Sequence, residues 1–331
     1  MHSVNDISYT SSKNSCLPQA GKSLHERLTG KSLEMLSLSD CIPWMTVGLT
    51  ESVAIVTLNL CTIIVFITNR NLRKRSTYLV INLAVIDMFV GGIAVYVLFH
   101  IPGVECKLWN WHSTAVGIEI YILELSTFFV FGSLINITII ALERVHATFC
   151  PFNHRVLKKR VYRLIIAVVW VISGLITIAY LLLGQLEKGY YSFYFYITFI
   201  SLCLLIVCVS YSSIVIKVRC GAQPQHHGAT SREIKLTMTL LIVTVASLLL
   251  NLPFVIGRVL VFSNFEIFES LSFSVSYHLN NILLVLFLAN SLVNPILYAI
   301  RMSEYRSTLL AFFSKRTQQQ RQVAVVPLRD M

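Results

Sequence analysis

Seven long apolar stretches constrain this chain more than any other feature of its sequence. The hydrocarbon core of a membrane is about 30 Å thick, and a helix crosses it at about 1.5 Å per residue, so about 20 apolar residues form one span. The stretches lie near residues 47–69, 76–101, 112–144, 161–183, 191–219, 233–262 and 274–299. With 55% hydrophobic and only 13% charged residues, the chain requires lipid as solvent. We expect an all-α fold, a seven-transmembrane helix bundle.

The remaining segments divide the chain into four parts. Residues 1–46 are polar without a signal-peptide core and are expected to form an extracellular tail, and residues 47–300 form the bundle. Residues 301–313 have an apolar face with basic residues around it, which predicts a short amphipathic helix on the membrane surface. Residues 314–331 follow as a cytoplasmic tail with few phosphorylation acceptors, chiefly Ser314 and Thr317, so we expect weak arrestin recruitment.

The formal charge of +11 is distributed unevenly across the membrane. The segments expected on one side of the membrane are residues 70–75, 144–163, 217–235 and 301–331. With the adjacent Glu143 included, they hold 20 Lys/Arg and 4 Asp/Glu. Basic loops remain in the cytosol, so the N-terminus is expected outside and the C-terminus inside a plasma membrane. Membrane lipids are thus expected partners, and the charge gives no reason to expect nucleic acid binding.

The eight cysteines do not form a disulfide scaffold, because most lie within spans or face the reducing cytosol. Only Cys16, Cys41 and Cys106 are expected outside. We favour a bridge between Cys41 and Cys106, because both lie close to helix ends.

A carboxylate in the second span, Asp87, requires polar partners, because a charge at a helix centre costs about 2.5–3.5 kcal/mol on insertion scales. Oxygen ligands suit a small hard cation such as Na+. The candidate sodium ligands are Asp87, Ser133, Asn290, Ser291 and Asn294, with Asn59 nearby. The alternative is a hydrogen-bonded network that only ties the helices together. No other cofactor is expected.

Two further patterns mark the inner ends of the third and seventh spans. Arg144 can pair with Glu143 in its own helix or with Glu233 at the start of the sixth, although an arginine at a helix end is often only a surface charge. Pro295, between Asn294 and Tyr298, frees a backbone carbonyl that a side chain or water must satisfy.

Taken together, these residues resemble the rhodopsin-like family of G-protein-coupled receptors, from Asn59 to about Phe313. Motifs fall in order along the spans: Asn59, Asn82 to Asp87, Glu143-Arg144, Trp170, Pro253, and Asn294 to Tyr298. The resemblance implies that an extracellular ligand shifts the sixth helix outward and opens a cavity for a heterotrimeric G protein. It implies a coupling and activation switch made of Glu143, Arg144, Phe152, Tyr211, Glu233, Asn294, Pro295 and Tyr298.

The chain departs from the family pattern mainly on the ligand side. Glu119 replaces a usual cysteine, Cys203 a common proline, Asn251 a usual aromatic residue and Ser247 a common Phe. Together with a short second outer loop, these departures look most like the melanocortin receptors, with a more distant likeness to lipid receptors.

The range of possible ligand classes is narrowed mainly by exclusion. Leu288 stands where opsins carry the retinal lysine, and Ser126 stands where aminergic receptors carry an aspartate. These positions favour a peptide or lipid over retinal or a biogenic amine. The candidate pocket residues are Glu119, Glu124, Ser126, Phe195, Phe199, Phe254, Arg258 and Asn280. We expect the two acids to meet a cationic group of a peptide; alternatively, Arg258 neutralises Glu124 and the rest is packing.

Other classes of membrane protein receive less support from the sequence. An intramembrane enzyme is not expected, because Asp87 has no second carboxylate at its depth and no Gly-x-Ser-x-Gly or His-Glu-x-x-His motif occurs. A multi-span transporter of a small solute is the alternative, but the spans contain no evident repeat or paired Gly/Pro breaks.

Overall fold

The computed structural model describes residues 37–69, 72, 77–108, 115–186, 190–220, 242, 245–247, 249–261 and 271–312. Its labelled helices are α2 (Leu38–Thr68), α3 (Thr77–Val95), the π-helix η1 (Tyr96–His100), α4 (Ile101–Glu105), α5 (Ala115–Phe149), α6 (Pro151–Val156), α7 (Lys159–Gly184), α8 (Tyr190–Cys220) and α11 (Phe273–Arg301). Helical residues also occupy 245–247, 249–261 and 303–312. The described part is helical with no strand, in agreement with the predicted fold class.

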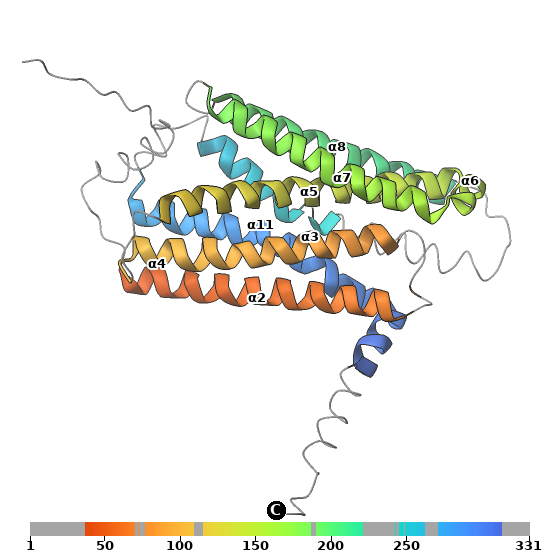
Figure 1. Ribbon diagram of the computed structural model, residues 1–331, viewed down its shortest axis with the longest axis horizontal. Coiled ribbons are helices and arrows are strands. Elements are labelled where there is room, and N and C mark those ends of the chain that lie inside the picture. Colours follow the sequence, from red (N-terminus) through yellow and green to blue (C-terminus); the bar gives the residue numbers. More distant parts are fainter. Residues whose placement is uncertain are drawn as a thin grey trace, which may run out of the picture.

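The long helices run side by side along one axis, and α5 lies between the α2–α3 pair and the α7–α8 pair (Figure 1). Six described helices are long and apolar enough to cross a membrane, and Val245–Val261 is a shorter apolar helix within the predicted sixth span. In Figure 1, α4 lies at one end of the bundle, whereas α6 and helix 303–312 lie at the other. We call these the α4 end and the α6 end. Helix 303–312 matches the surface helix predicted at 301–313.

The first long helix begins at Leu38 rather than near residue 47, so it takes in the end of the expected tail. Ser37 caps it by accepting a hydrogen bond from the Ser39 backbone N–H at 3.1 Å. The added turns carry Cys41 and Trp44, and contacts of these side chains with other helices hold the turns in place. The hydropathy pattern missed this start because tertiary contacts, rather than apolar length, stabilise it.

The second span changes its helical period near its end, where α3 passes into the π-helix η1. Pro102 follows at the start of α4 and has no N–H to donate to the carbonyl four residues before it, that of Leu98. The wider turn of η1 accommodates this missing bond.

Close backbone approach ties α2 to the second span. A Cβ added at Gly48 would lie 2.5 Å from Leu98 Cβ, and one added at Gly91 would lie 2.7 Å from Ile55 Cγ2. Small residues let helices in a membrane approach until backbone and side chain touch. This packing forms a rigid seam, which we call the α2–α3 seam.

Candidate functional site

The buried carboxylate Asp87 is surrounded by three hydrogen-bond donors. Ser133 on α5 and Ser291 on α11 donate to its Oδ1 at 3.0 and 2.9 Å, and Asn294 Nδ2 donates to its Oδ2 at 2.9 Å. Asn290, the fifth expected ligand, forms no hydrogen bond to Asp87 within the described part; its buried Oδ1 has no partner there. Four of the five residues grouped from the sequence therefore meet in one cluster, and α3, α5 and α11 are joined at mid-bundle.

The carbonyl freed by Pro295 has a definite partner. Four residues before the proline lies Ser291, and its backbone oxygen accepts a hydrogen bond from Asn59 Nδ2 at 3.0 Å. An asparagine on α2 thus stabilises the break in α11. A second amide bridge links three helices, since Asn82 donates to Asn136 at 3.0 Å and accepts from Trp170 Nε1 at 3.0 Å.

At the α6 end, Glu143 is the centre of a buried polar cluster. It forms an ion pair with Arg144 in its own helix. Its Oε1 also lies 2.7 Å from His154 Nε2 on α6 and accepts a hydrogen bond from the Tyr162 hydroxyl on α7 at 3.0 Å. Glu143 and Arg144 are 9% and 5% exposed, so the two side chains form a buried ion pair rather than a solvated pair at the surface. Sequence analysis missed His154 and Tyr162.

The other expected switch residues lie near this cluster or outside the description. Tyr211 and Tyr298 are buried in the hydrophobic core on the same side of the bundle, together with Tyr162. The Tyr298 hydroxyl has no hydrogen-bond partner among the described residues. Phe152 on α6 is 81% exposed. Glu233 lies outside the described residues, so the arginine pair seen is the one with Glu143.

Arg258 is the basic residue among the candidate ligand-binding residues, and it is exposed. Its guanidinium carbon lies 4.9 Å from the Phe254 ring centroid, and its Nη2 donates to Asn280 Oδ1 at 3.4 Å. Phe254 in turn packs on Phe287 of α11 at 4.6 Å between ring centroids. No ion pair between Arg258 and Glu124 occurs among the described side chains.

The candidate pocket residues on α5 do not share one face of the helix. Ser126 lies seven residues, or two turns, before Ser133 and so points toward the Asp87 cluster. Glu124 lies seven residues before Phe131, which contacts α7 and α8 through Tyr180 at 5.8 Å and Phe199 at 5.1 Å. The side chain of Glu119 lies outside the described part. The two acids expected from the sequence to act together are thus not placed together by any described contact.

Aromatic residues of α7 and α8 form a cluster with Phe131 that the sequence analysis missed. Tyr196 lies 5.8 Å from Phe131 and 6.1 Å from Tyr180, between ring centroids. Phe195 is half-buried, whereas Tyr191 and Tyr194, also considered earlier, are exposed. The signal for Tyr196 was its spacing from Ile200 and Cys203, both buried on the same face of α8.

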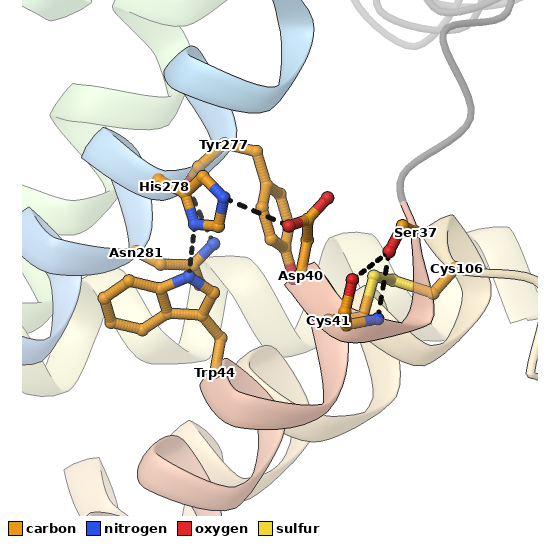
Figure 2. Close-up of a disulfide and its surroundings, with 9 residues drawn as sticks. Ser37, Asp40, Cys41, Trp44, Cys106, Tyr277, His278 and Asn281 are labelled. Atoms are coloured by element: carbon orange, nitrogen blue, oxygen red, sulfur yellow. Dashed lines mark hydrogen bonds and ion pairs between the residues drawn. A yellow bond between two sulfur atoms is a disulfide. The ribbon is translucent and has the colours of Figure 1, made fainter.

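At the α4 end, a disulfide and a histidine bridge fasten α2 to its neighbours (Figure 2). Cys41 is bonded to Cys106, the pairing favoured from the sequence. Figure 2 shows His278 of α11 between Trp44 and Asp40 of α2: the Trp44 indole N–H donates to His278 Nδ1 at 2.7 Å, and His278 Nε2 lies 3.6 Å from Asp40 Oδ1. His278 therefore holds α2 rather than facing the pocket around Arg258.

A multi-helix bundle with a buried arginine–glutamate pair at one end, a polar core and a cluster of aromatic side chains toward the other has the design of a signalling receptor. The model of the seven-transmembrane receptors of the rhodopsin family matches residues 58–298. The chain belongs to this family, which is a family of G-protein-coupled receptors rather than enzymes. The transporter alternative is therefore not needed.

Several relatives of known function are histamine receptors. The histamine H2 receptor of Homo sapiens is 28% identical, over 75% of this chain and 73% of the receptor. That of Rattus norvegicus is 28% identical over 83% of this chain and 82% of the receptor. The histamine H4 receptor of Homo sapiens is 26% identical over 46% of this chain. The likeness to melanocortin receptors gains no support from these relatives.

Proposed function

We propose that this receptor binds an extracellular small organic ligand and, once activated, engages a heterotrimeric G protein through Arg144. The observation that carries the proposal is the buried Glu143–Arg144 pair, which in a receptor of this family describes an inactive state. A ligand favours activation only by as much as it binds the active state better. The charge distribution further supports a plasma-membrane protein with its C-terminus inside.

Activation requires that Arg144 leave Glu143 and gain other partners. Burial of both groups makes the pair costly to break, unless hydrogen-bond acceptors take over the guanidinium. Tyr211 and Tyr298 belong to the same buried core as Tyr162, and the Tyr298 hydroxyl has no described partner. We infer that these two hydroxyls receive Arg144 when the helices separate, leaving Phe152 exposed for contact with the G protein.

The test is basal and stimulated G-protein dissociation in cells, measured across the main G-protein classes. Glu143→Gln removes the charge that holds Arg144, so basal dissociation is expected to rise in one class. Arg144→Ala is expected to abolish dissociation at equal surface expression. The proposed mechanism is wrong if Glu143→Gln reaches the surface without raising basal dissociation of any G-protein class, and Arg144→Ala signals like the parent.

For the ligand we propose a small amine, rather than the peptide or lipid favoured by the sequence. The support is that the relatives are named as histamine receptors. Ser126 provides no charge for an ammonium group, so another carboxylate of α5 must pair with it. Glu124 is the candidate, because its carboxylate has no hydrogen bond or ion pair to another described residue.

A second candidate ligand carries a carboxylate or another anionic group. It is favoured by Arg258, which is the charge of the candidate pocket and is fixed by Phe254 and Asn280 without a described acidic partner. A guanidinium presents a fork of donors that fits a carboxylate. The two candidates differ in the sign of the ligand charge and in the residue that binds it.

A panel of small amines and small carboxylates, screened with the same dissociation readout, separates the two. An amine agonist is expected to lose about tenfold or more in potency with Glu124→Gln and little with Arg258→Gln, since a charged hydrogen bond contributes about 1.5–3 kcal/mol. A carboxylate agonist is expected to show the reverse. An amine whose potency survives Glu124→Gln would overturn the assignment of Glu124.

We also propose that the Asp87 cluster binds Na+. The support is chemical: the carboxylate is buried among hydroxyl and amide groups, and the Oδ1 atoms of Asn290 and Asn294 are buried without described partners. A cation there would balance the charge of Asp87 and take up amide oxygens that otherwise lack a donor. The bound ion would favour the helix arrangement in which α3, α5 and α11 meet.

A further inference from the structure

His278 on α11 contacts α2 through both of its ring nitrogens (Figure 2). Its Nδ1 lies 2.7 Å from the indole nitrogen of Trp44, and its Nε2 lies 3.6 Å from Asp40 Oδ1. An indole N–H can only donate, so Nδ1 accepts this hydrogen bond and carries no proton. The proton of the neutral ring is therefore on Nε2, the nitrogen that faces Asp40. The bond to Trp44 thus exists only while His278 is neutral.

Protonation of His278 changes the residue of α2 that it holds. With a proton on Nδ1, two N–H groups would face each other across 2.7 Å, so the hydrogen bond to Trp44 is lost. The positive ring is instead attracted to the carboxylate of Asp40, and the 3.6 Å contact becomes an ion pair. Asp40 and Trp44 are four residues apart, or about one turn of α2. One proton therefore exchanges one attachment between α2 and α11 for another that lies a turn away.

The groups around His278 leave this ring as the one that responds to pH in the physiological range. Among the described residues, its titratable neighbours are Asp40 of α2 and Tyr277 of its own helix, whose ring centroid lies 5.9 Å away. Carboxylates and tyrosines ordinarily keep their charge between about pH 5 and pH 8, whereas histidine changes its charge there. The side chains of His278 and Asp40 are 37% and 32% exposed, so protons reach them from solvent.

The same turn of α11 carries a candidate ligand-binding residue, Asn280, two residues after His278. Asn280 Oδ1 accepts a hydrogen bond from Arg258 of the sixth span at 3.4 Å. The facing part of α2 is fastened to the second span by the disulfide between Cys41 and Cys106. When His278 changes its partner on α2, the turn of α11 is therefore the part that shifts, and the contact between Asn280 and Arg258 shifts with it.

We propose that His278 is a proton sensor at the extracellular end of the receptor. The neutral ring holds Trp44, and the protonated ring holds Asp40 and shifts the outer turn of α11. The bond to Trp44 belongs to the arrangement in which Glu143 and Arg144 are paired, so its loss in acid disfavours the inactive state. Exposure of this end to the cell exterior rests on the orientation proposed above, whereas the exchange of partners does not.

The exchange of partners is measured by the indole N–H resonance of Trp44 in the purified full-length receptor, labelled with nitrogen-15 tryptophan. The chain has four tryptophans, and the resonance of Trp44 is the one absent from Trp44→Phe. Between about pH 8 and about pH 5.5 it should move along a one-proton titration curve as the hydrogen bond is lost. His278→Gln keeps an acceptor but takes up no proton, so the resonance should stay in place. A constant resonance in the parent would overturn the proposal.

Melting temperatures provide an independent measurement, because the two partners respond to pH with opposite signs. Trp44→Phe should lower the melting temperature by about 2 °C at about pH 8 and leave it unchanged at about pH 5.5. Asp40→Asn should show the reverse pattern with a smaller loss, since both side chains of the ion pair are partly exposed. If each variant loses as much at one pH as at the other, both contacts are only structural and the proposal is wrong.

The matched control for both measurements is another histidine toward the α4 end. His100 lies in η1 and stacks on Tyr96 of the same helix, with ring centroids 4.6 Å apart. His100→Gln should therefore keep the pH response of the parent in the Trp44 resonance. A response that disappears with His100→Gln and survives His278→Gln would assign the sensor to the wrong histidine.

Signalling measures whether the sensor acts on the cytosolic end of the receptor. Glu143→Gln is the background, because it is expected to signal without ligand. Lowering the external pH from about 8 to about 6 should raise its basal G-protein dissociation by about two- to tenfold, and added His278→Gln should abolish this rise. Equal dissociation at both pH values would overturn the link to activation. If Glu143→Gln does not signal at all, the proposed function fails instead, and the resonance and melting measurements still decide the role of His278.

Discussion

The two sides of the bundle differ in how tightly they are packed. In the α2–α3 seam the glycines Gly48 and Gly91 let side chains of the facing helix touch the backbone, and Asn59 and Asn82 find partners on other helices. Around the sixth span, two cavities remain. Buried polar atoms without described partners occur on both sides, in Asn251 and Ser247 here and in Glu51, Ser52 and Asn59 on α2.

The contrast in packing indicates where the helices can move at a low cost in free energy. Close-packed seams have one arrangement, because any displacement loses contacts and opens voids. A helix bordered by cavities loses fewer packing contacts when it moves, and it can exchange water-mediated hydrogen bonds as it shifts. We infer that α2 and α3 form the frame of the receptor and that the sixth span is its moving part.

The largest expected effect comes from removing the disulfide that fastens α2 at the α4 end. Cys41 and Cys106 are 65 residues apart, and closing a loop of that length contributes about 4 kcal/mol in the chain-entropy treatment. Cys41→Ser with Cys106→Ser should lower the melting temperature and surface expression strongly. Cys61→Ser, a free cysteine of the same helix, is the control and should have little effect. If the double variant melts at the same temperature as the parent, other contacts hold α2 at the α4 end.

The next largest effect is expected from overpacking the α2–α3 seam. Gly91→Val places a branched side chain where even a Cβ would lie 2.7 Å from Ile55, so it should destabilise by about 1–3 kcal/mol. The neighbouring Gly92 has nothing within 4 Å of an added Cβ, and Gly92→Val is the matched control. If both variants melt at the same temperature, the seam is not as rigid as its geometry indicates.

Much of the frame could be predicted from sequence, because it depends on patterns within single helices. The lengths of the apolar stretches predicted the spans, and Pro295 predicted a backbone carbonyl that requires another hydrogen-bond donor. The group of residues around Asp87 followed from the cost of a charge in lipid. Each of these arguments requires only the depth of a residue in the membrane.

The partners that the sequence analysis missed depend on how the helices rotate about their axes. Tyr162 and His154 reach Glu143 from α7 and α6, and Trp44 reaches His278 from the start of α2. Lipid is as apolar as the bundle interior, so hydropathy does not tell the inner face of a span from the outer one. The alternative of a Glu124–Arg258 pair depended on the same rotation, and no such ion pair occurs among the described side chains.

A smaller effect is expected at the α6 end, where Tyr162 donates to Glu143. Tyr162→Phe removes the hydrogen bond to Glu143, about 1 kcal/mol or more, and also the 3.1 Å contact of the hydroxyl with His154 Nε2. Basal G-protein dissociation should therefore rise by about fivefold, with little change in melting temperature. Tyr121→Phe, at a side chain that is 72% exposed, serves as control. Unchanged basal activity would show that Arg144 and His154 alone hold Glu143.

The smallest expected effects come from two substitutions, one on each side of the bundle. They distinguish the two sides most directly, because each removes one buried hydroxyl. Thr62 Oγ1 on α2 donates to the Leu58 carbonyl at 2.8 Å and lies 2.9 Å from the Tyr305 hydroxyl, so Thr62→Val should cost about 1 kcal/mol in unfolding free energy. Ser247 Oγ has no partner among the described residues, and Ser247→Ala removes a desolvated group without breaking a bond. Its melting temperature should equal or exceed that of the parent. A loss as large as that of Thr62→Val would mean that the hydroxyl is bonded to ordered water, and the sixth span would then be held more firmly than its cavities indicate.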